Sequence, residues 1–179
     1  TYTCVGPAVG SSGTQSQAFH LEWNGKDNPN VNVTLKNGTI TSTASESSGV
    51  QMLVQNYCNL TLDHMVLDGT NVTAGYTLSN NCGNVVIKDS TILAPESGVA
   101  FDVCDFASYT GVTVTVEGKS YVQGKIEVVN ANKGENNAHL VLKGGYYTVD
   151  QVSTAYSDSS AVKDLASYVA EGYSLISSD

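Results

Sequence analysis

The stretch VTLKNGTI, residues 33–40, is compatible with two local structures. Asn37-Gly38 between two apolar runs is the strongest short signal for a β-hairpin. The same residues also fit a corner between two strands of a longer coil. The two structures can be distinguished, because the corner of a coil returns along the chain at a regular period.

Four other stretches resemble residues 33–40. They are LTLDHMVL at 60–67, VVIKDSTI at 85–92, VTVEGKSY at 114–121 and LVLKGGYY at 140–147. When the five copies are aligned on their third residue, these anchors lie 27, 25, 29 and 26 residues apart. Only the first copy contains Asn-Gly, whereas a hairpin would need its special turn residues each time. The repeat therefore predicts an all-β solenoid, a parallel β-helix of about five to six coils.

The residue after each anchor tests the parallel register. These residues are Lys36, Asp63, Lys88, Glu117 and Lys143, and their charges alternate. In a parallel coil they would stack about 4.8 Å apart, where opposite charges favour pairing of adjacent strands and like charges repel. We expect this charge ladder to set the register more than it adds stability, because exposed ion pairs are individually weak.

Two apolar columns are expected to face inward. The first contains the anchors Leu35, Leu62, Ile87, Val116 and Leu142, and the second contains Ile40, Leu67, Ile92, Tyr121 and Tyr147. Cys58 lies four positions before its anchor and is expected to point inward as a small hydrophobe. Cys82 and Cys104 follow the second strands of successive coils and are the best-placed pair for a disulfide, with four buried thiols as the alternative.

The 179 residues are predicted to form one domain. We expect an N-terminal cap and first strand over 1–30, with Trp23 covering the first coil, then coils over 31–150 and a C-terminal cap over 151–179. Within that cap, apolar residues at helical spacing predict a helix over 160–171 that closes the last coil.

Composition excludes two classes of partner. The net charge is −9 and all eight basic residues are Lys, so a basic, Arg-bearing face for nucleic acid is not expected. No apolar run reaches 18 residues, so no membrane insertion is expected. A monomer, or part of a longer multidomain chain, fits these observations.

Two segments resemble a known group of proteins. NVTLKNGTI, residues 32–40, resembles the coils of pectate-lyase-like right-handed β-helix proteins. The stretches LKGGYYTVDQV and DLASYVAEGYSLI, at 142–152 and 164–176, resemble a segment of adhesin-like secreted and cell-surface proteins of anaerobic Gram-positive gut bacteria. The matching residues are Gly144, Gly145, Tyr146, Tyr168, Val169, Ala170, Gly172 and Tyr173. The resemblance implies a right-handed helix and an extracellular location.

Enzymes of the resembled group cleave polysaccharides with carboxylates, His and basic residues. This chain has no Arg, which removes the base that the lyases use. Asp102 and Asp105 are the candidate paired carboxylates of an enzyme, and solvated acids at a strand end are the alternative. His20, His64 and His139 do not have a metal or triad spacing, and His64 is expected to be exposed at a corner. No metal or cofactor is expected, with Ca²⁺ as the one candidate that Asp-rich turns could hold.

Aromatic residues offer a route to ligand binding. Tyr146 is expected to point outward and, with Tyr109, is the candidate ligand-facing aromatic. Three functions remain open: a non-catalytic adhesin-like module that binds a glycan or host macromolecule, a polysaccharide-active enzyme, and a structural stalk. Three or more carboxylates in one groove would favour the enzyme. Exposed aromatics on a flat sheet would favour glycan binding, and a featureless charged surface would favour the stalk.

Overall fold

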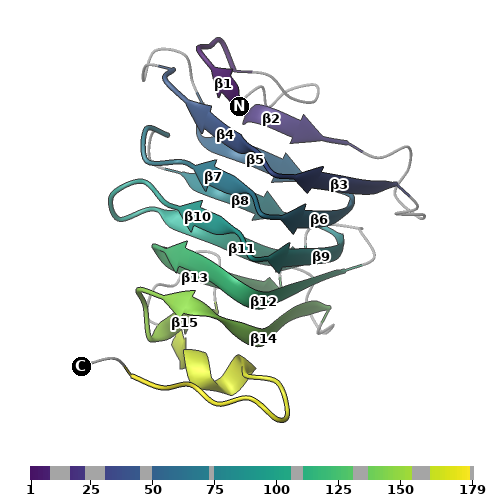
Figure 1. Cartoon of the computed structure of the whole chain (residues 1–179), viewed down its shortest axis with the longest axis vertical. Helices are drawn as coiled ribbons and strands as arrows, with labels where there is room; N and C mark the ends of the chain where they lie inside the picture. The colour runs from purple at the N-terminus through teal and green to yellow at the C-terminus, as the bar shows by residue number, and fades with distance from the viewer. Residues whose placement is uncertain are drawn as a thin grey trace.

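The computed structural model describes residues 1–8, 17–22, 31–44, 50–72, 75–105, 111–130, 137–154 and 162–177. Trp23 and Tyr109 lie outside these residues, so the predictions about them are not tested. The chain folds as a parallel β-solenoid of about four turns, somewhat fewer than the five to six predicted. The two ends of the chain lie at opposite ends of the solenoid (Figure 1).

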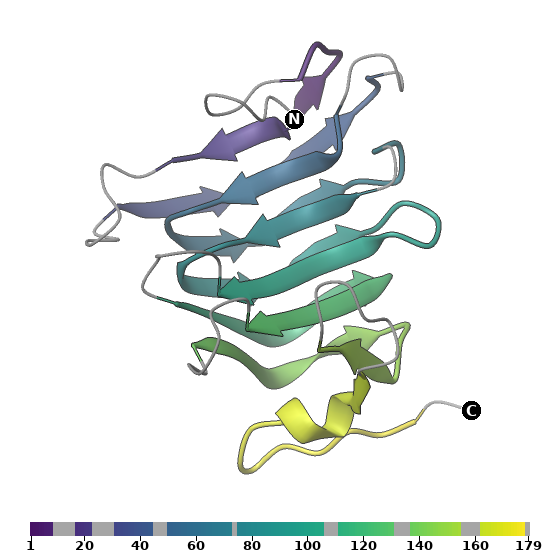
Figure 2. The same ribbon diagram turned by 180° about the vertical axis from the view of Figure 1, so that it is seen from behind.

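Two sheets form the walls of the solenoid. Sheet A has the strand order β1-β4-β7-β10-β12-β9-β6-β3, with β14 also paired to β12, and sheet B has the order β16-β15-β13-β11-β8-β5-β2. Figure 2 shows the stacked strands of sheet B from behind. Each coil passes once through sheet B and then crosses sheet A in two parts separated by a bend.

The strands are regular over most of the chain. Sheet A contains β1 (Tyr2–Cys4), β3 (Asn32–Lys36), β4 (Thr39–Ser42), β6 (Asn59–Asp63), β7 (Val66–Asp68), β9 (Gly83–Lys88), β10 (Thr91–Leu93), β12 (Val112–Gln123) and β14 (Ala138–Tyr147). Sheet B contains β2 (Gln17–Leu21), β5 (Met52–Asn56), β8 (Tyr76–Asn80), β11 (Val99–Asp105), β13 (Lys125–Asn130), β15 (Gln151–Ser153) and β16 (Val162–Asp164). Because β12 and β14 continue through the bend, each forms one long strand where the other coils have two.

The predicted anchor column is confirmed. Leu35 pairs with Leu62, Leu62 with Ile87, Ile87 with Val116, and Val116 with Leu142, all in parallel register. The last four anchors are buried, and Leu35 at the end of the sheet is half-buried. Burial of this apolar column in every coil is the main source of stability in the first part of sheet A.

The Asn37-Gly38 pair forms a corner and not a hairpin. Asn37, His64 and Asp89 have φ angles of 53°, 55° and 47°, and Gly118 takes the next place with a φ of 67°. Their conformation is the left-handed one, which Asn, Asp, His and Gly adopt more readily than other residues. The N–H groups of Asn37 and His64 donate to the carbonyls of Asp63 and Lys88 at 3.1 and 3.2 Å, so the corners stack from coil to coil.

The second inward column is correct except at Tyr121. Ile40, Leu67 and Ile92 are in register, but the next member is Val122. The register shifts between Gly118 and Tyr121, because β12 has one more residue in its bend than β9 and β10 together. This insertion turns Tyr121 outward. Tyr147 pairs with Val122 and packs half-buried against the core, as predicted.

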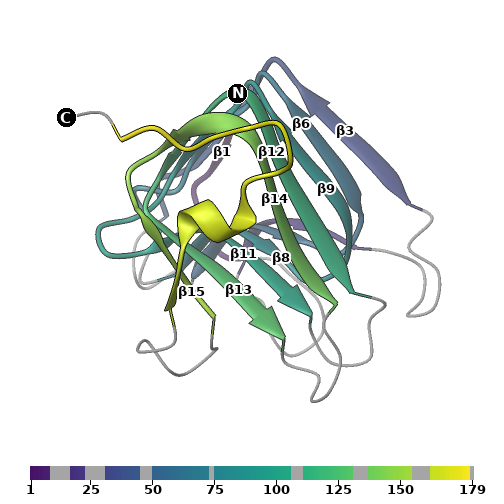
Figure 3. The same cartoon turned by 90° about the horizontal axis from the view of Figure 1, so that it is seen from below.

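The predicted helix over 160–171 is wrong. Residues Val162–Asp164 form β16, which pairs antiparallel with β15, and a short 3₁₀-helix, η2 (Leu165–Tyr168), follows. Leu165 is buried against the last coil, and Val169 forms a parallel bridge with Leu142 of β14. Figure 3 shows η2 across the lower end of the solenoid. The segment closes that end as predicted, but it does so by pairing with strands instead of by an α-helix. In the described part of the chain, no helix is long and apolar enough to cross a membrane.

Candidate functional site

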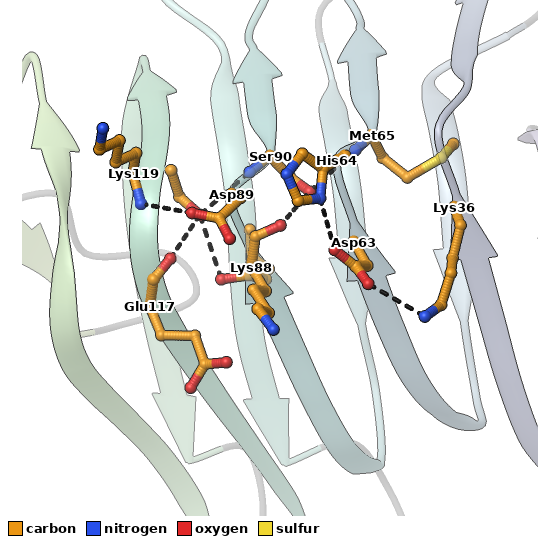
Figure 4. A network of polar contacts seen from close by, with 11 residues as sticks. Lys36, Asp63, His64, Met65, Lys88, Asp89, Ser90, Glu117 and Lys119 are labelled. Carbon is orange, nitrogen blue, oxygen red and sulfur yellow. Dashed lines mark hydrogen bonds and ion pairs between the residues drawn. The ribbon is translucent and has the colours of Figure 1, made fainter.

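The charge ladder lies in register on the outer surface of sheet A. Lys36, Asp63, Lys88, Glu117 and Lys143 pair successively across β3, β6, β9, β12 and β14, as the sequence predicts. Figure 4 shows the first four of these side chains. Among the described residues, Lys36 Nζ and Asp63 Oδ2 form the one Lys–carboxylate ion pair, at 3.1 Å. The row therefore specifies alignment through its order of charges more than through closed ion pairs.

Asp63 is the most strongly engaged member of the ladder. His64 Nδ1 lies 2.6 Å from Asp63 Oδ1, while Lys36 contacts the other carboxylate oxygen. The hydrogen bonds from His64 and from Lys36 lower the pKa of Asp63 below its ordinary value. His64 is exposed at its corner, which confirms the sequence prediction.

The outer surface of β12 and β14 carries a strip of different character. At its start, a depression of about 180 Å³ has a polar lining. This lining includes Asn59, Asn84, Thr113, Asn137 and His139. Along the same two strands follow Glu117 beside Lys143 and, after the bend, Tyr121 beside Tyr146.

Tyr121 and Tyr146 form an exposed aromatic pair. They are register partners on β12 and β14, and they are 37% and 65% exposed. Tyr146 points outward as expected, but its described aromatic neighbour is Tyr121, for which the repeat predicts a place in the core. The length of the bend is the signal that could have shown the outward orientation of Tyr121. Between the ladder residue and the next strand position, Gly118-Lys119-Ser120 is one residue longer than Asp89-Ser90 in the preceding coil.

Asp102 and Asp105 do not form a carboxylate pair. Both lie on β11 and both are buried, but they are three positions apart, and residues at that spacing point to opposite faces of a strand. The register partner of Asp102 is Glu127 of β13. The structure therefore replaces the predicted Asp102–Asp105 pair by an Asp102–Glu127 pair, in which the partners come from neighbouring coils.

Asp102 lies in a polar environment that is closed to water. It is 4% exposed, Ser79 Oγ donates to its Oδ2 at 3.1 Å, and the N–H of Asn80 donates to its Oδ1. Burial raises the pKa of Asp102 to about 7, and the nearby Glu127 adds to the rise. Burial also raises the pKa of Glu127, although the Tyr76 hydroxyl donates to it at 3.0 Å.

Two carboxylates with raised pKa values are a common feature of acid–base sites. Here the geometry does not provide access, because Asp102 is almost fully buried and lines neither of the two depressions described in sheet A and at the C-terminal end. Within the described residues, no three His, Cys, Asp or Glu side chains are grouped closely enough to hold a metal ion. The Asp102–Glu127 pair is therefore best explained as a structural feature of sheet B.

Cys82 and Cys104, the best-placed pair for a disulfide, are not bridged, and the structure has the alternative of four buried thiols. Cys4, Cys58, Cys82 and Cys104 are all free and buried. Cys82 packs with Cys58 in a small cluster, and Cys58 faces inward as predicted. Burial raises the pKa of Cys82 and of Cys104 to about 12, so both remain thiols at neutral pH and are poor nucleophiles.

Comparisons with protein-family models, with curated proteins and with solved structures find no match to this chain.

Proposed function

We propose that this chain is a non-catalytic, adhesin-like β-helix module that binds a glycan on the outer surface of sheet A. The supporting observation is the Tyr121–Tyr146 pair, two exposed rings on adjacent strands of a regular sheet. Tyrosine rings offer an apolar face with a polar rim, which suits the apolar face of a sugar ring. Adjacent strands lie about 4.8 Å apart, so the two rings could contact one or two consecutive sugar units.

The rest of the strip extends this surface. From Thr113 to Tyr121 the chain advances eight residues, at most about 26 Å at 3.3 Å per residue. Glu117 and Lys143 lie between the polar depression and the tyrosines, where they can form hydrogen bonds with sugar hydroxyls. With both signs of charge along the strip and a net charge of −9, the surface favours a neutral glycan over a strongly anionic one.

The tyrosine pair distinguishes this proposal from the two alternatives. A stalk would need no exposed aromatic pair, and an enzyme would need carboxylates that a substrate can reach. Asp102 and Glu127 are two carboxylates on the other sheet, and Asp102 is buried. The pectate-lyase-like and adhesin-like resemblance of the repeat and the C-terminal segment supports an extracellular module in which the glycan belongs to a host or a neighbouring cell.

A glycan array tests the proposal directly. The wild-type chain is expected to bind a neutral oligosaccharide, and Tyr146→Ala and Tyr121→Ala are each expected to weaken binding by about 5- to 30-fold, from roughly 1–2 kcal/mol per stacked ring. Tyr173→Ala is the matched control, because Tyr173 is 53% exposed in the C-terminal segment. No binding to any glycan, or binding that survives the double tyrosine variant with an unchanged melting temperature, would contradict the proposal.

A further inference from the structure

The outer edge of β3 is an open end of sheet A. β3 is the last strand in the order of the sheet, and among the described residues no strand pairs with its outer edge. The neighbouring strands at the same end differ from β3. β1 pairs with β4, and β2, which is the last strand of sheet B, accepts a hydrogen bond from the Tyr2 hydroxyl at the carbonyl of Ala18 at 2.9 Å. As far as the described residues go, the first part of sheet A therefore ends in a strand whose outer edge has no partner strand, and such an edge is a template for another strand.

The backbone of β3 presents specific groups to this edge. The N–H of Asn59 donates to the carbonyl of Val31 at 3.0 Å, and the N–H of Asn37 donates to the carbonyl of Asp63 at 3.1 Å. In a parallel ladder, successive residues turn their N–H and C=O groups to alternate neighbours. The odd-numbered residues of β3 therefore bond with β6, and Thr34 and Lys36 direct their backbone groups to the open edge.

The apolar columns of the core continue to this edge. Val33 and Leu35 are half-buried, whereas their partners in the next coil, Leu60 and Leu62, are 1% and 0% exposed. A further strand with apolar residues in the same two rows would complete the burial of both side chains. Within the solenoid, the apolar side chains of each coil are buried in the same way by those of the adjacent coil.

The charge ladder specifies what this further strand should carry. Lys36 is the first member of the row, and its side chain is 57% exposed. Within the part of the chain that the structure describes, its ionic partner is Asp63 of β6, on the inner side. At each step along the row, from one coil to the next, the sign of the charge changes. The next position on the open edge is therefore suited to an acidic residue, and a basic residue there would be repelled.

A second copy of this chain is a poor occupant. At the other end of the solenoid, β14 is already engaged: Val169 forms a bridge with Leu142, and the N–H of Ala170 donates to the carbonyl of Leu142 at 2.9 Å. End-to-end stacking in register would also place Lys143 of one copy beside Lys36 of the next, which is a pairing of like charges. The two ends are therefore not complementary.

We propose that the edge of β3 is a docking site for a parallel β-strand of a partner polypeptide, with the pattern apolar–polar–apolar–acidic. Its two apolar side chains cover Val33 and Leu35, its backbone bonds with Thr34 and Lys36, and its acidic side chain lies beside Lys36. This is strand addition to an exposed sheet edge. The site lies at the opposite end of sheet A from Tyr121 and Tyr146, and it does not depend on the proposed glycan site.

The test uses a strand whose fit to β3 is known. The peptide Asn-Leu-Thr-Leu-Asp copies residues 59–63, which already pair with β3 on its inner side. Amide hydrogen exchange is measured on the full chain with and without this peptide, whose ends are acetylated and amidated so that they carry no charge. Slower exchange of the Thr34 and Lys36 amides is expected, with no change at Leu35, whose amide already bonds with β6. A peptide ending in Lys instead of Asp is the matched control and should have a weaker effect.

A tethered version removes the limit of weak affinity. Tyr2 pairs with Ile40 and Ile40 with Leu67, so Thr1 occupies the row of Val66. A copy of residues 59–65 fused before Thr1 therefore places its Leu62 equivalent beside Leu35 and its Asp63 equivalent beside Lys36. Tethering raises the effective concentration of the strand. At least tenfold slower exchange of the Thr34 and Lys36 amides and a higher melting temperature are expected.

Three results would overturn the proposal. The first is strong protection of the Thr34 and Lys36 amides in the unmodified chain, which would mean that its own residues cover the edge. The second is unchanged exchange in the fused chain. The third is equal protection by fusions carrying Asp or Lys at the acidic position, which would remove the charge specificity. Glycan binding is measured on the same samples, so the failure of either proposal can be recognised separately.

Discussion

Asp102→Asn is expected to make the chain more stable at pH 8 and to leave its stability at pH 4 almost unchanged. The amide has the shape of the carboxyl group. Its oxygen can accept from the N–H of Asn80, and its NH₂ group can donate to the Ser79 hydroxyl, which donates to Asp102 in the wild type. The variant therefore keeps the local hydrogen bonds and removes only the ability to ionise.

The magnitude follows from the pKa of Asp102. This pKa is about 7 in the folded chain, against 3.8 for an ordinary Asp carboxyl. A carboxyl with a raised pKa binds its proton more tightly when folded, so its contribution to stability is complete below about pH 3.8 and is lost as the pH rises through about 7. The rise of the Asp102 pKa from 3.8 to about 7, at 1.36 kcal/mol for each tenfold change in proton affinity, corresponds to about 4 kcal/mol of stability. For a chain of this size, that is a difference of about 8–16 °C in melting temperature.

The assay is thermal unfolding of the wild type and Asp102→Asn at intervals between pH 4 and pH 8. The difference between the two curves reports the titration of Asp102 together with its coupling to Glu127, because the remaining titrating groups are common to both. Glu96→Gln is the control, since Glu96 is exposed and its curve should follow the wild type. If Asp102→Asn gains no stability over the wild type between pH 4 and pH 8, then Asp102 is either ionised at little cost or accessible to water, and the account of its burial is wrong.

Three further outcomes are expected. Asp63→Lys should lower the melting temperature more than the exposed Glu171→Lys, because it places three Lys in a row, and the difference should shrink in high salt; equal effects would refute the ladder. Leu62→Ala should cost about 3 kcal/mol in urea unfolding and Leu35→Ala clearly less, because Leu62 is fully buried and Leu35 is not; a reversed order would refute the open end of sheet A. Thiol titration without reductant should detect four reactive thiols in the unfolded chain and almost none in the folded chain. Detection of only two thiols after unfolding would indicate a disulfide.

The sequence predicted the first part of sheet A well because one physical requirement recurs there in every coil. Anchors such as Leu62 must point inward, and the following residue must point outward beside a neighbour of opposite charge. Those two demands act on adjacent positions, so the alignment of five copies was sufficient to assign both columns. The stacked corners followed from the same alignment.

The errors arose where the period changes or where sheet B was not aligned. One extra residue after Gly118 reversed the orientation of Tyr121, and the fixed step from anchor to second apolar position concealed it. The partner of Asp102 was missed because Glu127 is close only through the pairing of successive sheet B strands. Aligning β11 with β13 would have found it, whereas nearness in sequence suggested Asp105.

The C-terminal segment shows a different limit. Apolar residues of 160–171 at helical spacing also suit a short strand followed by a single turn, and the choice depends on what the last coil leaves unpaired. β15 offers an edge that β16 occupies, and Leu142 offers a carbonyl that Ala170 reaches. Local spacing contains no information about those partners, so tertiary pairing determined the structure there.

The placement of the chain ends at opposite ends of the solenoid has a mechanical consequence. A force applied between the two ends acts along the stack of coils, so the hydrogen bonds between one pair of coils break before those of the next pair. Stretching should therefore unfold the coils one at a time, at low force. With anchors 25 to 29 residues apart, each event should lengthen the chain by about 90 Å at roughly 3.4 Å per residue. A domain that yields in small steps of this kind dissipates energy over a long extension, as a shock absorber does.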